Sequence, residues 1–224
     1  MNSAGASRQS TSLPESKASP IVFVVDDDIS VRESLELLIA SAGWKAKTFA
    51  SATEFLAHPC APVPSCLVLD LSLPGLNGLE LQKRISGERA DLPIIFITGH
   101  GDVPKTVQAM KAGAVEFLTK PFSDGALLGA IRLGLERSRA VLGQKAEMQE
   151  LQHCHASLTP REQQVMALVV SGLLNKQVGS ELGISEITVK AHRGQVMQKM
   201  KAESLADLVK MSGKLGVASQ KPDR

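Results

Sequence analysis

Short apolar runs alternate with helix-period segments between Ile21 and Leu135. Four of these runs are dense in Val, Ile, Leu or Phe instead of alternating with polar residues: 21–25, 66–71, 93–98 and 115–118. Such runs are typical of strands buried on both faces. The run 44–49 alternates more and is expected to form an edge strand. Five strands alternating with helices predict an α/β fold with a doubly wound parallel sheet.

Capping signals mark where some of the intervening helices begin and end. Ser30 with Glu33, and Ser51 with Glu54, have the spacing of a capping box. Gly43 stands where a C-cap glycine would close the first helix. These signals predict helix starts at the two serines and a helix end just before the glycine.

A further helix is expected from Ser123, and it continues into the charged, Gln-rich stretch 137–152, which is typical of a helical linker. A second domain opens at Leu158. The segment 159–162 has capping-box spacing, with a proline at the first helical position. Glycines then divide the remaining chain into short helices: Gly172, Gly183 and Gly213.

Composition is that of an ordinary globular protein. Apolar residues make up 43% of the 224, and the mean hydropathy is +0.03. No apolar run approaches the roughly 18 residues of a membrane span. The Ser- and Ala-rich start at 1–19 lacks the apolar stretch of a secretory signal, and three irregularly spaced cysteines give no disulfide framework. We therefore expect a cytoplasmic protein with a flexible N-terminal tail and no membrane partner.

Charge differs between the two parts of the chain. Residues 21–140 carry 12 Lys and Arg against 14 Asp and Glu, a net charge of −2. Residues 158–224 carry 10 against 6, a net charge of +4. A mildly acidic domain joined to a basic one suggests different partners, with a polyanion as one option for the basic end.

Five chemically active side chains follow the predicted parallel strands: Asp26 and Asp27 after the first, Asp70 after the third, Thr98 after the fourth and Lys120 after the fifth. Because chemistry collects at the carboxyl ends of parallel strands, these side chains are expected to converge on one edge of the sheet. Three carboxylates repel one another unless a cation intervenes. Mg²⁺ suits carboxylates and accepts phosphate oxygens. The set fits in-line attack by a carboxylate on phosphorus, with Thr98 donating a hydrogen bond to a phosphoryl oxygen.

Each of these residues also has an ordinary structural explanation. The acidic run 26–28 would favour the N-terminus of a helix, Asp70 could belong to a turn, and Lys120 could be a loop lysine. All of these explanations would have to coincide on one edge of one sheet, which favours the phosphoryl-transfer site.

The basic C-terminal part contains two predicted helices around Gly183, and Ser185 is a good N-cap for the second. In that second helix Thr188, Lys190, Arg193 and Lys199 are polar or basic, whereas Ile187, Val189, Val196 and Met200 can pack inward. Helix, tight turn and basic helix is the helix-turn-helix arrangement. The alternative is a small bundle with a solvated basic face. The lack of interleaved aromatics argues against single-strand or RNA binding by stacking.

The motifs of the first domain, taken in order, resemble the receiver domain of two-component response regulators. They are VVDDD at 24–28, LDLSLPGLNG at 69–78, IT at 97–98 and KPF at 120–122. TGHGDVP at 98–104 and AMKAGA at 109–114 are similar to the FixJ-like branch of that family. The resemblance covers about residues 20–135 and implies a flavodoxin-like (βα)5 domain.

This resemblance implies a role for each acidic residue. Asp70 would be the phosphoacceptor. Asp27 would bind Mg²⁺ directly and Asp26 mainly through water, and the backbone carbonyl of Ser72 would complete the protein ligands.

It also implies how the phosphorylated state is recognised. Lys120 would contact the phosphate, and its bond to Pro121 is expected to be cis. Thr98 would swing toward the phosphate while the ring of Phe117 turns inward. Because phenylalanine has no hydroxyl, no hydrogen-bonded readout through that ring is expected.

The second domain resembles the LuxR-type DNA-binding domain over about residues 157–215. The similar segments are LTPRE at 158–162, NKQV at 175–178, LGIS at 182–185 and TVKAHR at 188–193. By position, the DNA contacts would be Lys190 and Ala191 on base edges and Thr188, Arg193 and Lys176 on phosphates. Gly194 stands where some relatives carry a basic residue that contacts the groove, so base readout is not expected there.

Together these patterns predict a tail at 1–19, a receiver domain at 20–137, a helical linker at 138–156 and a LuxR-type helix-turn-helix domain at 157–218. The hypothesis is a transcriptional regulator that catalyses only its own phosphotransfer and dephosphorylation. A sensor histidine kinase would phosphorylate Asp70, and a homodimer would place two DNA-binding domains on adjacent half-sites of promoter DNA. RNA polymerase is a further expected partner.

Two other classes of function stay open at this point. One is a phosphohydrolase with an aspartate nucleophile, although the stretch 70–72 lacks the second Asp of an Asp-x-Asp motif. A nucleotide-binding switch is a related possibility, but the sequence has no Gly-rich phosphate loop. The other is an adaptor whose C-terminal domain binds protein, against which Lys190 and Arg193 on one helix argue.

Overall fold

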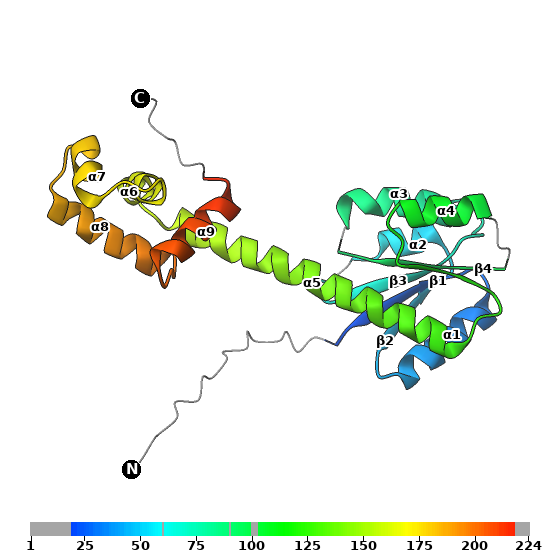
Figure 1. The fold of residues 1–224 in the computed structure, drawn as a ribbon. Helices are drawn as coiled ribbons and strands as arrows, with labels where there is room; N and C mark the ends of the chain where they lie inside the picture. The colour runs from blue at the N-terminus through cyan, green and yellow to red at the C-terminus, as the bar shows by residue number, and fades with distance from the viewer. Residues whose placement is uncertain (1–18, 60, 90, 100–102, 218–224) are drawn as a thin grey trace, which may run out of the picture. The chain divides into compact units, whose positions relative to one another are not determined.

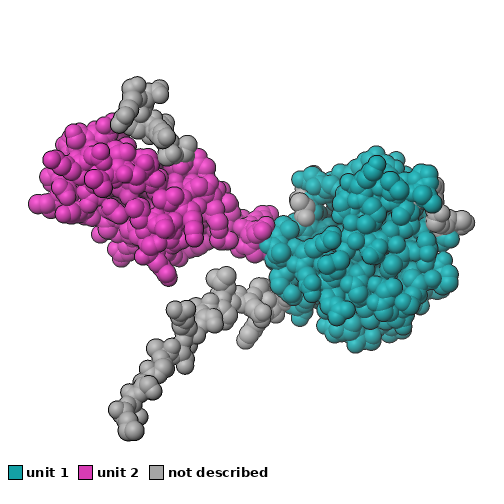
Figure 2. All heavy atoms as spheres, in the orientation of Figure 1, with its two compact units in different colours: residues 1–142 teal, residues 143–224 magenta. Residues whose placement is uncertain are grey.

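The chain forms two compact units, the N-terminal unit (Met1–Leu142) and the C-terminal unit (Gly143–Arg224) (Figure 2). The computed structural model describes residues 19–59, 61–89, 91–99 and 103–217. Among these residues, the N-terminal unit combines strands with helices, and the C-terminal unit is built from helices.

A parallel sheet runs through the N-terminal unit, with five strands in the described residues (Figure 1). They are β1 (Ile21–Val25), β2 (Lys45–Phe49), β3 (Ser65–Asp70), β4 (Ile94–Thr98) and β5 (Glu116–Thr119), in the spatial order β2-β1-β3-β4-β5. Strands β3 and β4 are buried along their whole length, as dense apolar runs predict. The alternating strand β2 lies at an edge. The predicted doubly wound α/β fold is confirmed.

Helices cover both faces of this sheet (Figure 1). One face carries α1 (Ile29–Ser41) and the first part of α5 (Asp124–Ala156), and the other carries α2 (Ala52–Ala57), α3 (Gly78–Glu88) and α4 (Val103–Lys111). Two apolar clusters fill the layers between helices and sheet. Fully buried side chains in them include Phe23, Phe55, Phe96, Ile39, Leu127 and Ile131. Burying each such side chain stabilises the fold by about 1.5–3 kcal/mol.

The start of α1 differs from the prediction. Asp28 is the N-cap, and its side chain accepts a hydrogen bond from the N–H of Ser30 at 2.8 Å. The predicted capping box of Ser30 with Glu33 is therefore wrong, because a better-placed carboxylate lies two residues earlier. Ser51 does cap α2, by accepting from the N–H of Glu54.

Helix α5 continues for 33 residues and begins directly after Ser123, where a helix was predicted to start. The Ser123 hydroxyl accepts from the N–H of Ala126 at 3.2 Å. Ser138 is fully buried in it, donates to the carbonyl of Asp91 at 2.7 Å and accepts from the N–H of Ser65 at 3.1 Å. From Leu151 onward α5 belongs to the core of the C-terminal unit. The predicted linker segment is thus helical. Its first residues contact the N-terminal unit, and its last residues belong to the core of the C-terminal unit.

The C-terminal unit contains four further helices in its described residues: α6 (Pro160–Val170), α7 (Asn175–Leu182), α8 (Glu186–Lys199) and α9 (Leu205–Leu215). The predicted capping box at the start of α6 is present. Thr159 accepts from the N–H of Glu162, and the Glu162 carboxylate accepts from the N–H of Thr159 at 2.7 Å and pairs with Lys199 at 2.7 Å. None of the helices in the described part of the chain is long and apolar enough to cross a membrane.

Candidate functional site

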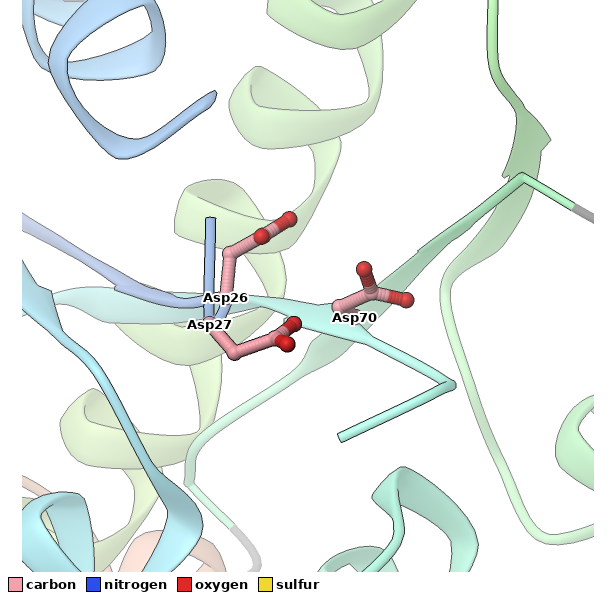
Figure 3. Close-up of side chains that lie close together, drawn as sticks. All are labelled: Asp26, Asp27 and Asp70. Carbon is pink, nitrogen blue, oxygen red and sulfur yellow. The ribbon is translucent and has the colours of Figure 1, made fainter. Parts of the chain in front are cut away.

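Three carboxylates meet at the carboxyl end of the sheet (Figure 3). Asp26 follows β1 directly and Asp70 is the last residue of the neighbouring strand β3. Ligand oxygens of Asp26, Asp27 and Asp70 all lie within 4.8 Å of one another. Asp26 is fully buried and Asp70 is 7% exposed, whereas Asp27 faces solvent. The order of strands, which reverses between β1 and β3, brings these residues together.

Lys120, in the segment after β5, completes the cluster. Its Nζ donates to Asp26 Oδ2 at 2.8 Å and to Asp70 Oδ2 at 3.0 Å. The backbone N–H of Lys120 donates to the carbonyl of Thr98 at 2.7 Å, which holds this segment beside β4. The bond between Lys120 and Pro121 is cis, as predicted. One ammonium group therefore serves two buried carboxylates.

Burial shapes the protonation of this cluster. It raises the pKa of the Asp26 carboxyl, although hydrogen bonds from Lys120 and from the N–H of Asp28 favour the charged form. Burial also disfavours the charged form of Lys120, but its hydrogen bonds to Asp26 and Asp70 outweigh that effect and raise the pKa of the lysine. Three carboxyl groups therefore share one ammonium group.

The donor set of the cluster fits a hard divalent cation. Carboxylate oxygens are ligands of Mg²⁺, which binds through one or two carboxylates and keeps its remaining positions for water and phosphate oxygens. Within the part of the chain that the structure describes, Asp26, Asp27 and Asp70 are the one group of three acidic, His or Cys residues close enough to hold a metal. Ser72 lies in the turn after β3, where its N–H donates to Asp70 Oδ1 at 3.0 Å. That its carbonyl is a further ligand stays a prediction.

The two predicted switch residues lie on neighbouring strands. Thr98 ends β4 and is fully buried. Phe117 lies in β5 and is half-buried, with its ring centroid 6.2 Å from that of Phe96. Phe96 pairs with Phe117 in the β4–β5 register, two residues before Thr98. Thr98 and Phe117 are therefore two register positions apart on paired strands, and their coupled movement stays a prediction.

The roles of two residues that shape this site, and of a third that contacts α4, were not found from the sequence. Arg32 on α1 donates from Nη1 to the backbone carbonyls of Asp26 at 2.8 Å and Asp27 at 3.0 Å, and so fixes the acidic turn. Gly78 is the first residue of α3 and lies very close to the backbone of Asp70. A Cβ at this position would be 2.8 Å from the Asp70 carbonyl oxygen. Gln82 is buried and its amide donates to two carbonyls at the C-terminal end of α4. Side chain–backbone contacts at this sequence separation leave no periodic signal.

Helices α7 and α8 form a helix-turn-helix in the C-terminal unit. Gly183 ends α7 with a φ of 66°, and the Ser185 side chain accepts from the N–H of Thr188 at the start of α8, as predicted. Val178 and Val189 are fully buried between the two helices. Packing inside this pair leaves the outer face of α8 to solvent.

The predicted DNA contacts lie on these helices, and four of the five are exposed: Thr188, Lys190 and Ala191 on α8 and Lys176 on α7. Lys190 forms an exposed ion pair with Glu186 at 3.4 Å. Arg193 is half-buried and donates to the side chain of Asn175 at 3.2 Å. The expectation that Ile187 packs inward is wrong, because its side chain is 80% exposed.

Comparison with protein families identifies both units. Residues 22–132 match the response regulator receiver domain, and residues 156–212 match the luxR family of bacterial regulatory proteins. Each match contains the residues described above, the acidic cluster in the first and helices α7 and α8 in the second.

Relatives match along nearly the whole chain. Nodulation protein W of Bradyrhizobium diazoefficiens is 52% identical over 205 residues, which cover 92% of this chain and 90% of the relative. The transcriptional regulatory protein FixJ of Azorhizobium caulinodans is 44% identical over 92% of this chain and 96% of its own length. The structure of the response regulator StyR is similar with a TM-score of 0.81 at 50% identity, covering 88% of this chain and all of that one. The chain belongs to the two-component response regulators of the FixJ-like family, which join a receiver domain to a LuxR-type DNA-binding domain.

Proposed function

We propose that Asp70 accepts a phosphoryl group from a sensor histidine kinase and that phosphorylation switches dimerisation and sequence-specific DNA binding. The observation that carries this proposal is the position of the Asp70 carboxylate. It lies 3.0 Å from the Lys120 ammonium and beside the carboxylates of Asp26 and Asp27. A nucleophile, a fixed cation and a set of metal ligands are the parts that phosphoryl transfer requires.

In the proposed reaction, a carboxylate oxygen of Asp70 attacks the phosphorus of a phosphohistidine in line. The new P–O bond forms as the P–N bond breaks, and the imidazole leaves with the electron pair of that bond. Lys120 then lies beside the phosphoryl oxygens and offsets their charge, and the Thr98 hydroxyl donates to one of them. The protein catalyses only this transfer to itself and its own dephosphorylation, with no separate substrate.

The acidic residues have distinct parts in holding Mg²⁺. Asp27 and Asp70 would bind the ion directly, Asp26 mainly through water, and the Ser72 carbonyl would complete the protein ligands. When bound, the ion neutralises negative charge on the phosphoryl oxygens during transfer. The exposure of Asp27 supports its direct role, because an ion at that carboxylate can keep several water ligands.

Output would run through the face formed by α4, β5 and the first part of α5, about residues 103–112 and 123–132. This face would then either dimerise or release the DNA-binding domain. Movement of Thr98 and Phe117 biases this face between two states. Three apolar residues on one side of α4 support its use in a homodimer: Val103, Val107 and Met110 are 72%, 45% and 41% exposed. A dimer presents two LuxR-type domains to adjacent half-sites of promoter DNA and raises affinity through effective concentration. A complex that recruits RNA polymerase would complete the regulatory function.

Sedimentation velocity tests this proposal on the full chain with Mg²⁺ and acetyl phosphate as phosphodonor. We expect a monomer-to-dimer shift in the native chain and none in the Asp70→Asn variant, which preserves shape but lacks the nucleophilic carboxylate. A dimer that forms equally in Asp70→Asn would refute the switch. Multiple turnover of a phosphate ester by the native chain would instead support the phosphohydrolase alternative.

A further inference from the structure

Ile187 is the most exposed large apolar side chain among the residues that the structure describes, at 80%. It lies in the first turn of α8, two residues before Val189, which is fully buried. Val196, one helical repeat of seven further on, is also buried, so these two valines hold the helix to its unit. Ile187 lies on the other side of the helix and makes no contribution to that packing. A β-branched residue is not favoured in a helix for its propensity either.

The neighbours of Ile187 on its own face are also exposed. Lys190, Ala191 and Gly194 follow it at intervals of three, four and seven residues, which places all four on one stripe of α8. The stripe presents one branched apolar group, one ammonium, one methyl group and one position without a side chain. Nothing among the described residues covers it. This combination offers apolar contact and a hydrogen-bond donor side by side.

The chemistry of the DNA major groove matches that combination. Thymine is the base whose major-groove edge carries a methyl group, and guanine presents two acceptors there that suit a lysine. In helix-turn-helix domains the N-terminal residues of the second helix contact base edges, and Ile187 lies in that first turn. The excess of basic residues in 158–224 favours a polyanion over a protein surface as the occupant.

We propose that Ile187 reads the methyl group of a thymine in each half-site, next to the base contacted by Lys190. This inference rests on the proposed DNA binding and adds a specificity-determining residue to it. Removing one methyl group from an apolar contact should weaken binding about fourfold per contact. Gly194, one turn beyond Ala191, leaves room for the groove to approach the helix closely.

The test uses the full chain, phosphorylated with acetyl phosphate and Mg²⁺. A random-sequence duplex pool is first enriched by binding to the native chain. The enriched duplex is then synthesised with one thymine at a time replaced by deoxyuridine, which pairs identically and lacks just the methyl group. The native chain should lose about fourfold in affinity at one thymine in each half-site. Ile187→Ala should bind the thymine and deoxyuridine duplexes equally at that position.

Two variants serve as controls. Ile187→Val keeps a branched apolar group and should retain most of the preference for thymine. Val209→Ala removes a comparable side chain, 43% exposed, from α9 and should behave like the native chain. Because both sites are exposed, none of these variants removes a core contact, and circular dichroism should be unchanged.

Two results would overturn the inference, and they are distinguishable. If the native chain enriches a sequence but Ile187→Ala keeps the same thymine-to-deoxyuridine ratio, the thymine contact is absent while DNA binding stands. If the phosphorylated native chain enriches no duplex, the proposed DNA binding itself fails, and the contact fails with it.

Discussion

The acidic cluster of the receiver domain and the outer stripe of α8 use their residues in opposite ways. Asp26 and Asp70 are buried, and each carboxylate lies 2.8–3.0 Å from the same ammonium. Ile187 and Lys190 are exposed, and the contact made by Lys190 is an ion pair at 3.4 Å on the surface. Burial makes the first site sensitive to protonation and to metal, because charges interact strongly away from water. The second site is an exposed surface, so we expect substitutions there to change the proposed DNA binding without changing the stability of the fold.

The first and largest test compares two glycines at close backbone approaches. A Cβ at Gly78 would lie 2.8 Å from the carbonyl oxygen of Asp70, and one at Gly179 would lie 2.7 Å from that of Ile184, in the turn between α7 and α8. Because backbone cannot yield cheaply, Gly78→Ala and Gly179→Ala should each destabilise their own unit by about 3 kcal/mol. Hydrogen exchange on the full chain should show faster exchange near β3 and α3 in the first variant and in α7 and α8 in the second.

Matched controls are provided by helical glycines with open space around the Cβ position. Gly129 in α5 and Gly213 in α9 have no atom within 4 Å of that position. Gly129→Ala and Gly213→Ala should therefore be neutral or stabilising by up to about 1 kcal/mol. Equal destabilisation in all four variants would contradict the idea that close approach is the cause.

The second test separates base readout from phosphate contact on the DNA-binding helices. Lys190→Ala should weaken binding to the enriched duplex by about 2 kcal/mol and relax the base preference at one position. Lys176→Ala should weaken binding to all duplexes alike and lower the log–log salt slope, which we expect to be about −6 for a dimer. Fluorescence anisotropy at several salt concentrations measures both. If Lys190→Ala loses the same affinity for all duplexes, Lys190 contacts a phosphate and not a base.

The third and smallest test uses opposite pH dependences in the two units. Burial raises the pKa of Asp26, so its contribution to stability is present below its unfolded pKa and is lost as pH rises through the folded value. The hydrogen bond from Lys199 lowers the pKa of Glu162, so its contribution is present above the unfolded pKa and is lost as pH falls through the folded value. In metal-free protein at neutral pH, Asp26→Asn should therefore stabilise the receiver domain. Glu162→Gln can keep the capping box and should cost under about 1 kcal/mol.

For each variant, the difference from the native chain in the free energy of unfolding should shrink when pH falls below the folded pKa of the substituted residue. The chain has a single tryptophan, Trp44, in the receiver domain, so its fluorescence during urea unfolding reports the Asp26 effect. Hydrogen exchange in α6 reports the Glu162 effect. A destabilising Asp26→Asn at neutral pH in the absence of metal would contradict the account of charge in the acidic cluster.

The sequence predicted the acidic site better than the DNA-binding face, for a physical reason. Dense apolar runs mark buried strands, and parallel topology then brings Asp26, Asp70 and Lys120 to one edge whatever the details of packing. On α8, helical spacing defines stripes but does not say which stripe is buried. Ile187 and Val189 were both predicted to pack inward, but residues two apart cannot share a helix face. The valine is buried and the isoleucine is exposed, and the sequence alone did not show which of the two would pack.

Local competition and long-range contacts explain the remaining differences. Aspartate is as good an N-cap as serine, and the Asp28 side chain caps α1 by accepting from the N–H of Ser30, the residue that was predicted to be the cap. The bonds of Arg32 to the carbonyls of Asp26 and Asp27 join a side chain to backbone five and six residues away, so no residue pattern reveals them.

The most direct test of the account is the intact mass of the chain after incubation with acetyl phosphate. The native chain with Mg²⁺ should gain the mass of one phosphoryl group, and hydroxylamine, which cleaves acyl phosphates, should remove it. Asp70→Asn, or the native chain with EDTA in place of Mg²⁺, should gain none. A stable phosphoryl group on Asp70→Asn, at the level seen in the native chain, would contradict the central claim that Asp70 is the acceptor.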